Sequence, residues 1–302
     1  MAVVYLNGRY IQAERAKVSA FDRGFIYGDG LFETIRTYAG WVFALDRHLG
    51  RLKKGADQIG IPFTGDAGKW RPVMDALLRR NHLQDTDASL RLTVTRGPDV
   101  LGPLLPPDAP PSPTLLLVAK PVDAGIAQRQ QVGGGVITVH WGDPFNPLQI
   151  KSLDYLYNIL ATAQAQREGA LEALFVGTDN CIIEGATSNV FSISHGVLTT
   201  PSESSGLLPG ITREVVIELA KREGLTVHET PLPLDTLLSA DEVFLTGSLK
   251  EITPVIAVDG RTIGTGRPGP VTQQLQQRYR TAVEEERVRG KCRGALRAPI
   301  QE

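Results

Sequence analysis

Lys151 is the residue whose surroundings in this sequence most need a chemical explanation. It follows Ile150 and precedes Leu153, Leu156 and Leu160, whose spacings of three and four predict the apolar face of a helix. Lysine is rarely buried completely unless a partner neutralises it, although its stem can pack while the ammonium reaches water. Other residues must therefore decide between a packed stem and a functional amine.

The position of Lys151 would favour an unprotonated amine. If Ser152 caps the predicted helix, the amine lies at the positive end of the helix dipole and among apolar side chains. Both effects disfavour the ammonium form, so they lower the pKa of the amine and make it a better nucleophile and base.

One carboxylate and three candidate anion sites accompany this amine. Glu184 follows an apolar strand and precedes small polar residues, which is compatible with partial burial or with a surface turn. Gly210 ends a loop and Thr212 can cap an amphipathic helix, and a helix N-terminus attracts anions even where it is only an ordinary cap. The segment 246–248, "TGS", and Arg51 are the other two candidates.

Nucleotide-binding glycine motifs do not explain these residues. In "RGFIYGDG" the glycines stand at 24, 28 and 30, which is not the G-x-G-x-x-G spacing. The following "LFETIR" alternates like a strand where the dinucleotide fingerprint needs a helix, and the Walker pattern is absent from the sequence.

The combined set of groups matches the needs of pyridoxal phosphate (PLP). Its aldehyde needs a lysine for a Schiff base, and its pyridine nitrogen needs an acidic partner. Its phosphate needs amide donors and an arginine. Lys151, Glu184, Thr212 and Arg51 could supply these groups together.

The first half of the chain predicts a sheet with two helices. Alternating apolar residues indicate strands, and the longer periodic segments indicate helices. The expected elements are a hairpin over 3–11 turning at Asn7-Gly8, strands over 31–45 joined at Gly40, helices over 45–60 (with Asp46 as N-cap) and 68–82, and strands over 89–97 and 114–121. A proline-rich loop over 97–113 separates the last two strands.

The second half predicts another such unit, so the fold class is α+β with two domains, each a mostly antiparallel sheet with helices. Its expected elements are a strand over 133–141, a helix after Lys151, hairpins over 172–185 and 189–201, a helix over 212–224, strands over 241–248 and 252–264, and a last helix over 271–286. We therefore expect an N-terminal domain over 1–120, a linker over 121–130, a larger cofactor-binding domain over 131–286 and a basic, disordered tail over 287–302.

Composition excludes several classes of protein. The 302 residues carry a formal net charge of −1, with 42% hydrophobic and 22% charged residues, so we expect no nucleic-acid partner and no membrane. No apolar run approaches the roughly 18 residues that span a bilayer, and the start lacks the pattern of a secretory leader. Cys181 and Cys292 fit neither a disulfide framework nor a zinc site, so we expect no metal and a cytoplasmic location.

From about residue 4 to 280 the chain resembles the class IV (fold-type IV) aminotransferases, which are PLP enzymes, and it looks most like their branched-chain members. The family also includes D-amino-acid transaminases, R-selective amine transaminases and aminodeoxychorismate lyase. The segments that carry the resemblance are "FDRGFIYGDGLFETIR", "LDRHLGRL", "IKSLDYL", "EGATSNVF", "GVLTTP", "LLPGITR", "ADEVFLTGS" and "ITPV".

The resemblance implies roles for the candidate residues. Lys151 would be the Schiff-base lysine and proton shuttle, and Glu184 would hold the pyridine nitrogen protonated. The phosphate would be held by Arg51, by the backbone at Ile211 and Thr212, and by Ser248. Tyr155 would approach the phenolic oxygen of the cofactor, and Asn189 would lie beside the ring.

The resemblance to branched-chain enzymes implies exchange of an amino group between a hydrophobic or branched-chain L-amino acid and 2-oxoglutarate. Arg91 stands where those enzymes keep a pocket arginine, but Thr34 replaces their usual glycine and Ser89 an expected tyrosine. D-amino-acid or R-amine transamination and the lyase reaction stay open, although the loop after "TRG" lacks the arginine that both the D-amino-acid enzymes and the lyase use there. The expected substrate-binding residues are Phe32, Thr34, Arg36, Arg91, Tyr27 and Leu249.

Two further expectations concern Arg36 and the assembly. Strand alternation puts Phe32, Thr34 and Arg36 on one face, where Arg36 would meet a substrate carboxylate or pair with a neighbouring acid. The family resemblance also implies a homodimer, in which the loop at 99–107 reaches into the partner's site.

Overall fold

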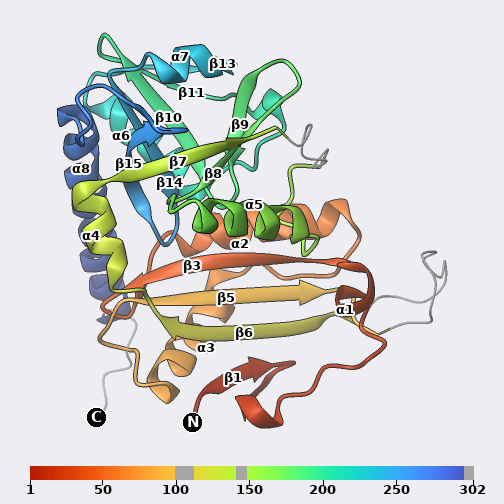
Figure 1. The fold of residues 1–302 in the computed structure, drawn as a ribbon. Coiled ribbons are helices and arrows are strands. Elements are labelled where there is room, and N and C mark those ends of the chain that lie inside the picture. The colour runs from red at the N-terminus through yellow and green to blue at the C-terminus, as the bar shows by residue number, and fades with distance from the viewer. Residues whose placement is uncertain (99–111, 141–147, 296–302) are drawn as a thin grey trace.

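The computed structural model describes residues 1–98, 112–140 and 148–295, which form two sheets with helices (Figure 1). The first sheet has six antiparallel strands in the order β2-β1-β6-β5-β3-β4. Its strands are β1 (Val3–Leu6), β2 (Arg9–Gln12), β3 (Gly30–Tyr38), β4 (Trp41–Val42), β5 (Ala88–Thr95) and β6 (Thr114–Pro121). The accompanying helices are α1 (Arg23–Tyr27), α2 (Leu45–Gln58) and α3 (Ala67–Arg80), with a 3₁₀ turn at Ala13–Arg15.

The second sheet has ten strands and is mixed. Its order is β12-β11-β10-β14-β15-β7-β8-β9-β13, with β16 paired to β15. The strands are β7 (Gly134–Val139), β8 (Ala173–Val176), β9 (Cys181–Gly185), β10 (Asn189–Ser194), β11 (Val197–Thr200), β12 (Thr226–Glu229), β13 (Leu232–Pro233), β14 (Glu242–Gly247), β15 (Glu251–Val258) and β16 (Arg261–Thr262). The helices are α4 (Gly125–Val132), α5 (Leu156–Arg167), α6 (Ile211–Arg222), α7 (Leu234–Leu238) and α8 (Pro270–Ala295), with a 3₁₀ turn at Glu203–Ser205.

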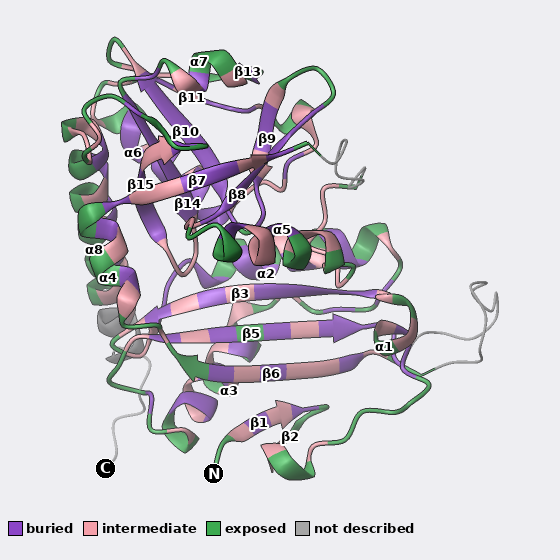
Figure 2. Cartoon of the chain, viewed as in Figure 1, coloured by how far each residue is buried: buried purple, intermediate pink, exposed green. Residues whose placement is uncertain are grey.

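Apolar alternation along the strands explains how the helices cover the sheets. Figure 2 shows buried positions running along the strands of both sheets, while the helices carry exposed residues on one side. In the first sheet the inward residues of β3 pack against α2 and α3, and Leu31, Ile35, Leu49, Leu52, Met74 and Leu77 share this core. In the second sheet α6 and α8 cover one face, around Phe191, Val216, Phe244, Leu275 and Tyr279. The predicted α+β class with two sheets is confirmed.

Backbone pairing joins the two sheets at the segment that contains the lysine of interest. Phe32 N donates to Lys151 O at 3.0 Å, and Leu153 N donates to Gly30 O at 3.0 Å. The segment 151–153 is therefore held as an extended chain against β3, and α5 begins only at Leu156. The prediction that Ser152 caps this helix is wrong, because pairing with a distant strand overrides the local helical pattern.

The apolar residues after Lys151 also lie differently from the prediction. Leu156 and Leu160 are on α5, but their exposed fractions are 63% and 48%. They do not form a buried helix face within the single chain. Their exposure leaves an apolar surface next to the junction of the two sheets.

Two other predicted helix starts are shifted by the backbone. The N-cap of α2 is Ala44, in a left-handed conformation with φ of 50°, so Asp46 lies inside the first turn. The N-cap of α6 is Gly210, so Thr212 also lies inside a first turn rather than capping it. Glu286 Oε1 accepts a hydrogen bond from Ala44 N at 3.0 Å and another from Trp41 Nε1 at 3.1 Å. A residue of the C-terminal helix thus binds the backbone where α2 begins.

The last helix extends beyond its predicted end. We expected a disordered tail from residue 287, but α8 continues to Ala295, and 296–302 lie outside the described residues. Gly290 packs so closely on Trp41 that an added Cβ would lie 1.8 Å from its ring. This contact with the first sheet explains the extension. The segment 121–130, expected as a linker, lies between the two sheets and contains the start of α4.

Within 1–98, 112–140 and 148–295, no helix has both the length and the apolar character needed to cross a membrane.

Candidate active site

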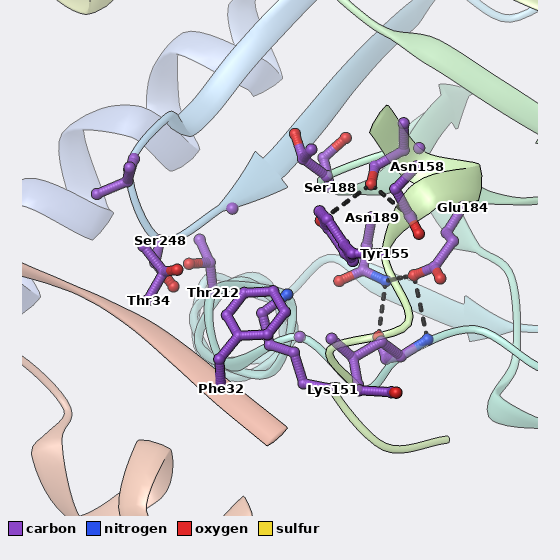
Figure 3. A pocket seen from close by; sticks show the side chains of 18 of the residues that line it. Phe32, Thr34, Lys151, Tyr155, Asn158, Glu184, Ser188, Asn189, Thr212 and Ser248 are labelled. Carbon is purple, nitrogen blue, oxygen red and sulfur yellow. Dashed lines mark hydrogen bonds between the residues drawn. The ribbon is translucent and has the colours of Figure 1, made fainter. Parts of the chain in front are cut away.

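A cavity of about 820 Å³ is lined by residues from both sheets and from the segment that joins them (Figure 3). Every residue predicted to bind the cofactor lines it: Arg51, Lys151, Tyr155, Glu184, Asn189, Ile211, Thr212 and Ser248. Four of the six predicted substrate residues line it as well: Phe32, Thr34, Arg91 and Leu249. Groups that are far apart in the sequence therefore meet in one space.

Lys151 enters this cavity from the extended segment that is paired with β3. Its Nζ lies 4.6 Å from the ring centroid of Phe32 and 5.6 Å from that of Tyr155. Burial, and then the charge of Arg51, lower the pKa of the Lys151 amine to about 8, although Glu33 and Glu184 oppose this shift. The helix-dipole argument for a lowered pKa is wrong, because no helix begins beside this residue. Desolvation supplies the effect instead.

Glu184, at the end of β9, presents a buried carboxylate to the same cavity. Its Oε2 accepts hydrogen bonds from Leu208 N at 3.1 Å and from Asn189 Nδ2 at 3.3 Å. Asn189 Nδ2 also donates to Leu208 O at 2.9 Å, so this amide orients the carboxylate. Burial raises the pKa of Glu184 to about 7, despite the Leu208 N–H and the charge of Lys151. A cationic partner would therefore stabilise the ionised form of this carboxylate.

Tyr155 forms part of the cavity wall next to the predicted substrate residue Phe32. Its ring packs edge-on against Phe32 with the centroids 5.2 Å apart. Its hydroxyl donates to Ala186 O at 3.2 Å, and burial raises its pKa to about 12. Asn158, which we did not predict, donates to the same carbonyl at 2.8 Å. Tyr155 is thus a neutral, fixed wall of the cavity.

The side of the cavity formed by the start of α6 and by Arg51 is suited to an anion. The first turn of α6, with Ile211 and Thr212, opens onto the cavity and has no side-chain cap. Thr246 also belongs to the lining, and its Oγ1 is buried with no hydrogen-bond partner among the described residues. A buried hydroxyl without a partner is costly, so a ligand that accepted its hydrogen bond would be stabilised here. Arg51 adds a full positive charge, and its Nη1 donates to Pro209 O at 2.6 Å.

Two residues that hold Arg51 were missed by sequence reasoning. Glu33 accepts hydrogen bonds from Arg51 Nε at 2.7 Å and Nη2 at 2.8 Å, and His48 Nδ1 lies 2.8 Å from the same carboxylate. Burial alone would raise the pKa of Glu33, but the charge of Arg51 and the hydrogen bond with His48 lower it to about 2. The only signal in the sequence was the i, i+3 spacing of His48 and Arg51, which puts both on one helix face.

We expect Glu33→Gln to destabilise the fold by about 3–5 kcal/mol, the usual cost of removing one member of a buried ion pair. Denaturant unfolding measures this difference. The folded pKa of Glu33 lies below its ordinary value of 4.5, so its stabilisation is present above that pH and is lost as the pH falls toward about 2. The pH dependence of unfolding below pH 4.5 should therefore be shallower in the variant.

Asp57→Asn is the matched control for this substitution, because Asp57 is an exposed acid on α2, the helix that carries Arg51, and it is paired with Lys53. It should change stability by less than about 1 kcal/mol. Equal effects of the two substitutions would contradict a structural role for the buried pair.

Two predicted substrate residues do not line the cavity. Tyr27 lies on α1 with 43% of its surface exposed, and the Arg23 guanidinium stacks over its ring at 5.0 Å. Arg36 shares the strand face of Phe32 and Thr34, but its guanidinium binds Asp87 at 2.8 Å and Glu251 at 3.2 Å. The alternative that Arg36 pairs with neighbouring acids is therefore correct. The predicted partner-reaching loop at 99–107 lies outside the described residues.

Comparison with known proteins agrees with this arrangement. The family profile described as amino-transferase class IV matches residues 30–258. A Methanocaldococcus jannaschii protein provisionally named branched-chain-amino-acid aminotransferase is 41% identical over 92% of this chain and 95% of its own. The D-alanine aminotransferase of Bacillus licheniformis is 36% identical (93% and 96% covered), and the aminodeoxychorismate lyase of Bacillus subtilis is 32% identical (93% and 95%).

Solved structures show the same architecture. The branched-chain amino acid aminotransferase of Escherichia coli is similar with a TM-score of 0.86 and 33% identity, covering 93% of this chain and 94% of that one. The T.th. branched-chain enzyme complexed with N-(5'-phosphopyridoxyl)-L-glutamate is similar with a TM-score of 0.83 and 31% identity over the same shares. Solved branched-chain aminotransferases thus share this fold.

Proposed function

Because the chain belongs to the class IV aminotransferases, we propose that it moves an amino group between a hydrophobic or branched-chain L-amino acid and 2-oxoglutarate, with PLP as cofactor. The observation that carries the substrate class is the Arg91 guanidinium in the cavity, 3.6 Å from the ring centroid of Phe32. An apolar surface and a cation side by side suit an apolar donor and a dicarboxylic acceptor in turn.

The residues present fit the cofactor. Lys151 offers an amine with a lowered pKa, and Glu184 offers a buried carboxylate. The Thr246 hydroxyl without a partner, together with Ser248, Arg51 and the first turn of α6, offers donors for a phosphate. Class IV aminotransferases use PLP, and the T.th. relative was solved with a phosphopyridoxyl adduct.

When bound here, PLP would supply a carbonyl carbon for amines and a ring that accepts electrons. Lys151 Nζ would hold the cofactor covalently, and after its release it would take the proton from the α-carbon of the donor. Glu184 would keep a proton on the pyridine nitrogen through its negative charge. Phe32 and Tyr155 pack beside the amine and contribute to the burial that lowers its pKa.

We expect the rate of covalent PLP attachment to Lys151 to rise with pH and to reach its half-maximum near pH 8, because only the neutral amine attacks a carbonyl and the Lys151 pKa is about 8. Stopped-flow absorbance after mixing apo-protein with PLP, between pH 6 and 10, measures this midpoint. A midpoint near the ordinary lysine value of 10.5 would show that the site does not lower the pKa.

Two other activities of the family compete with this proposal. The D-alanine aminotransferase at 36% identity keeps D-amino acids open, and R-amines use the same chemistry. The lyase at 32% identity keeps elimination of pyruvate from aminodeoxychorismate open. A panel of L-amino acids, D-amino acids and R-amines, followed by cofactor spectra in half-reactions, decides between the donors. Release of pyruvate and 4-aminobenzoate from aminodeoxychorismate would favour the lyase.

Arg91→Met is expected to raise the KM for 2-oxoglutarate by about 10- to 100-fold, which corresponds to the 1.5–3 kcal/mol of a hydrogen bond to a charged group. Arg91 has no ion-pair partner among the described residues, so its charge is available to a distal carboxylate. The KM for the monocarboxylic acceptor 2-oxoisocaproate should change less than about threefold. The KM of Arg91→Lys for 2-oxoglutarate should lie between those of the wild type and Arg91→Met. An equal rise of KM for both acceptors would argue against this role of Arg91.

We also propose a homodimer in which a second copy covers the apolar surface beside the cavity. This surface consists of exposed apolar residues on and around α1 and α5: Phe21, Phe25, Tyr27, Leu148, Leu156, Ile159 and Leu160. Such a patch usually marks an interface, and the family resemblance makes a second copy the expected partner. Light scattering of the purified protein tests the dimer, and a monomer at micromolar concentration would refute it. The cytoplasmic location stays a prediction.

A further inference from the structure

We propose that Arg36 is a positioning residue, which reaches from the first sheet to hold the turn 248–251 that forms one wall of the active site. The inference rests on the proposed function, because its consequences appear in cofactor binding and turnover. It assigns to Arg36 a different role from the substrate contact expected from strand alternation.

Arg36 makes two contacts that cross to the second sheet and one contact within the first sheet. Its Nη1 donates to Leu249 O at 2.7 Å and lies 3.2 Å from Glu251 Oε1, while its Nη2 donates to Asp87 Oδ2 at 2.8 Å. Only 12% of its side chain is exposed. Two carboxylates neutralise its charge, so it offers little attraction to an anionic substrate in the cavity. The contacts therefore indicate a structural clamp on the turn.

The turn itself needs external support. Glu251 has a φ of 52°, a left-handed conformation that is unfavourable for a residue with a side chain. From α4, Gln130 Nε2 donates to Lys250 O at 3.0 Å and to Glu251 Oε2 at 3.1 Å. Thr253 Oγ1 donates to Lys250 O at 3.0 Å as well. The carbonyls of Leu249 and Lys250 are thus both held from outside the cavity.

Holding these carbonyls fixes the groups that face a ligand. In a trans peptide the N–H points opposite to the C=O, so the direction of Leu249 O sets that of Lys250 N–H. Ser248, Leu249 and Lys250 all line the cavity, whereas Asp87 and Glu251 are not among its lining residues. Loss of the clamp should therefore loosen the Ser248 side of the phosphate site without removing any group that touches the substrate.

The test compares Arg36→Met with Arg36→Lys and Glu251→Gln. The dissociation constant of PLP is measured by absorbance titration of each apo-protein, and kcat and KM are measured with 2-oxoglutarate and with 2-oxoisocaproate. We expect Arg36→Met to weaken PLP binding about 10-fold and to lower kcat about 10- to 100-fold, with the ratio of the two KM values unchanged. Glu251→Gln should also weaken PLP binding and lower kcat. The double variant should lose less than the sum of the losses of the two single variants, because the two residues contact each other.

Two results would overturn this assignment. If Arg36→Met raises only the KM for 2-oxoglutarate, Arg36 binds a substrate carboxylate; if PLP affinity and kcat stay within twofold, it positions nothing. Arg36→Lys and Glu251→Gln, which keep a polar side chain, remain informative if the methionine variant does not fold. Failure of the wild-type protein to bind PLP would instead refute the proposed function. If the proposed amino donor is wrong, the PLP titration still tests Arg36, because it contains no donor.

Discussion

Replacing Lys151 by alanine is expected to lower the rate of transamination by about 10³-fold or more. The substitution removes the covalent anchor of the cofactor and the base that takes the α-proton, and a single general base contributes about 10²- to 10⁴-fold on its own. The amine has a pKa of about 8, so a larger fraction is unprotonated near neutral pH than for an ordinary lysine. Turnover of the amino donor with 2-oxoglutarate, followed by keto-acid release, measures the loss.

PLP should still bind to the Lys151→Ala protein through its phosphate, because Arg51, Ser248 and the first turn of α6 are unchanged. Equilibrium dialysis detects this binding. Lys54→Ala is the matched control, since Lys54 is an exposed lysine on α2, the helix that carries Arg51. Retained turnover in Lys151→Ala would refute the catalytic role of this amine.

The second large effect is expected for Glu184→Gln, which should lower kcat by about 10²- to 10³-fold. Glutamine keeps the size of the side chain and can still accept hydrogen bonds from Leu208 N and Asn189 Nδ2. It cannot supply the negative charge that holds a proton on the pyridine nitrogen, so electron withdrawal from the substrate weakens. The measured quantities are kcat at saturating substrate and the absorbance of the bound cofactor between pH 5 and 9.

Glu168→Gln makes the same substitution at an exposed position on the surface, and it should leave kcat within twofold. The absorbance of the wild-type cofactor should be constant over this pH range, while that of Glu184→Gln should change with the ionisation of the ring. Equal kcat values for Glu184→Gln and the wild type would show that the carboxylate does not face the ring nitrogen.

The sequence predicted the fold class, and it predicted residues that the structure gathers around one cavity, because both depend on short, local signals. Period-two alternation predicted strands such as β3 and β10, and the motifs around Lys151, Glu184 and Gly210 each lie on one short segment. The eight predicted cofactor residues line one cavity although 197 positions separate Arg51 from Ser248. The sequence alone does not say which distant segments lie close together in space. The order of several family motifs along the chain supplied that information.

The errors have a common physical origin in contacts between distant segments. Ser152 caps no helix because β3 binds the backbone on either side of it, and the tail after residue 286 is helical because it packs on Trp41. Glu33 was overlooked because a polar residue in a strand normally indicates a solvent-facing position. His48, on α2, was overlooked because its partner Glu33 lies 15 positions away on β3. For Arg36 the sequence left a substrate carboxylate and a neighbouring acid open, because its partner Glu251 is 215 positions away. None of these pairings follows from local propensity.

The hydrogen bond between Glu286 and the backbone of Ala44 has a consequence for how this protein is made. It spans 242 positions, and it satisfies an amide at the start of the helix that presents Arg51. During synthesis the chain leaves the ribosome from its N-terminus, so this amide can meet its partner only after nearly the whole polypeptide has been made. The contact between the start of α2 and α8 therefore forms only near the end of translation, which ties this support of the helix that carries Arg51 to completion of the chain.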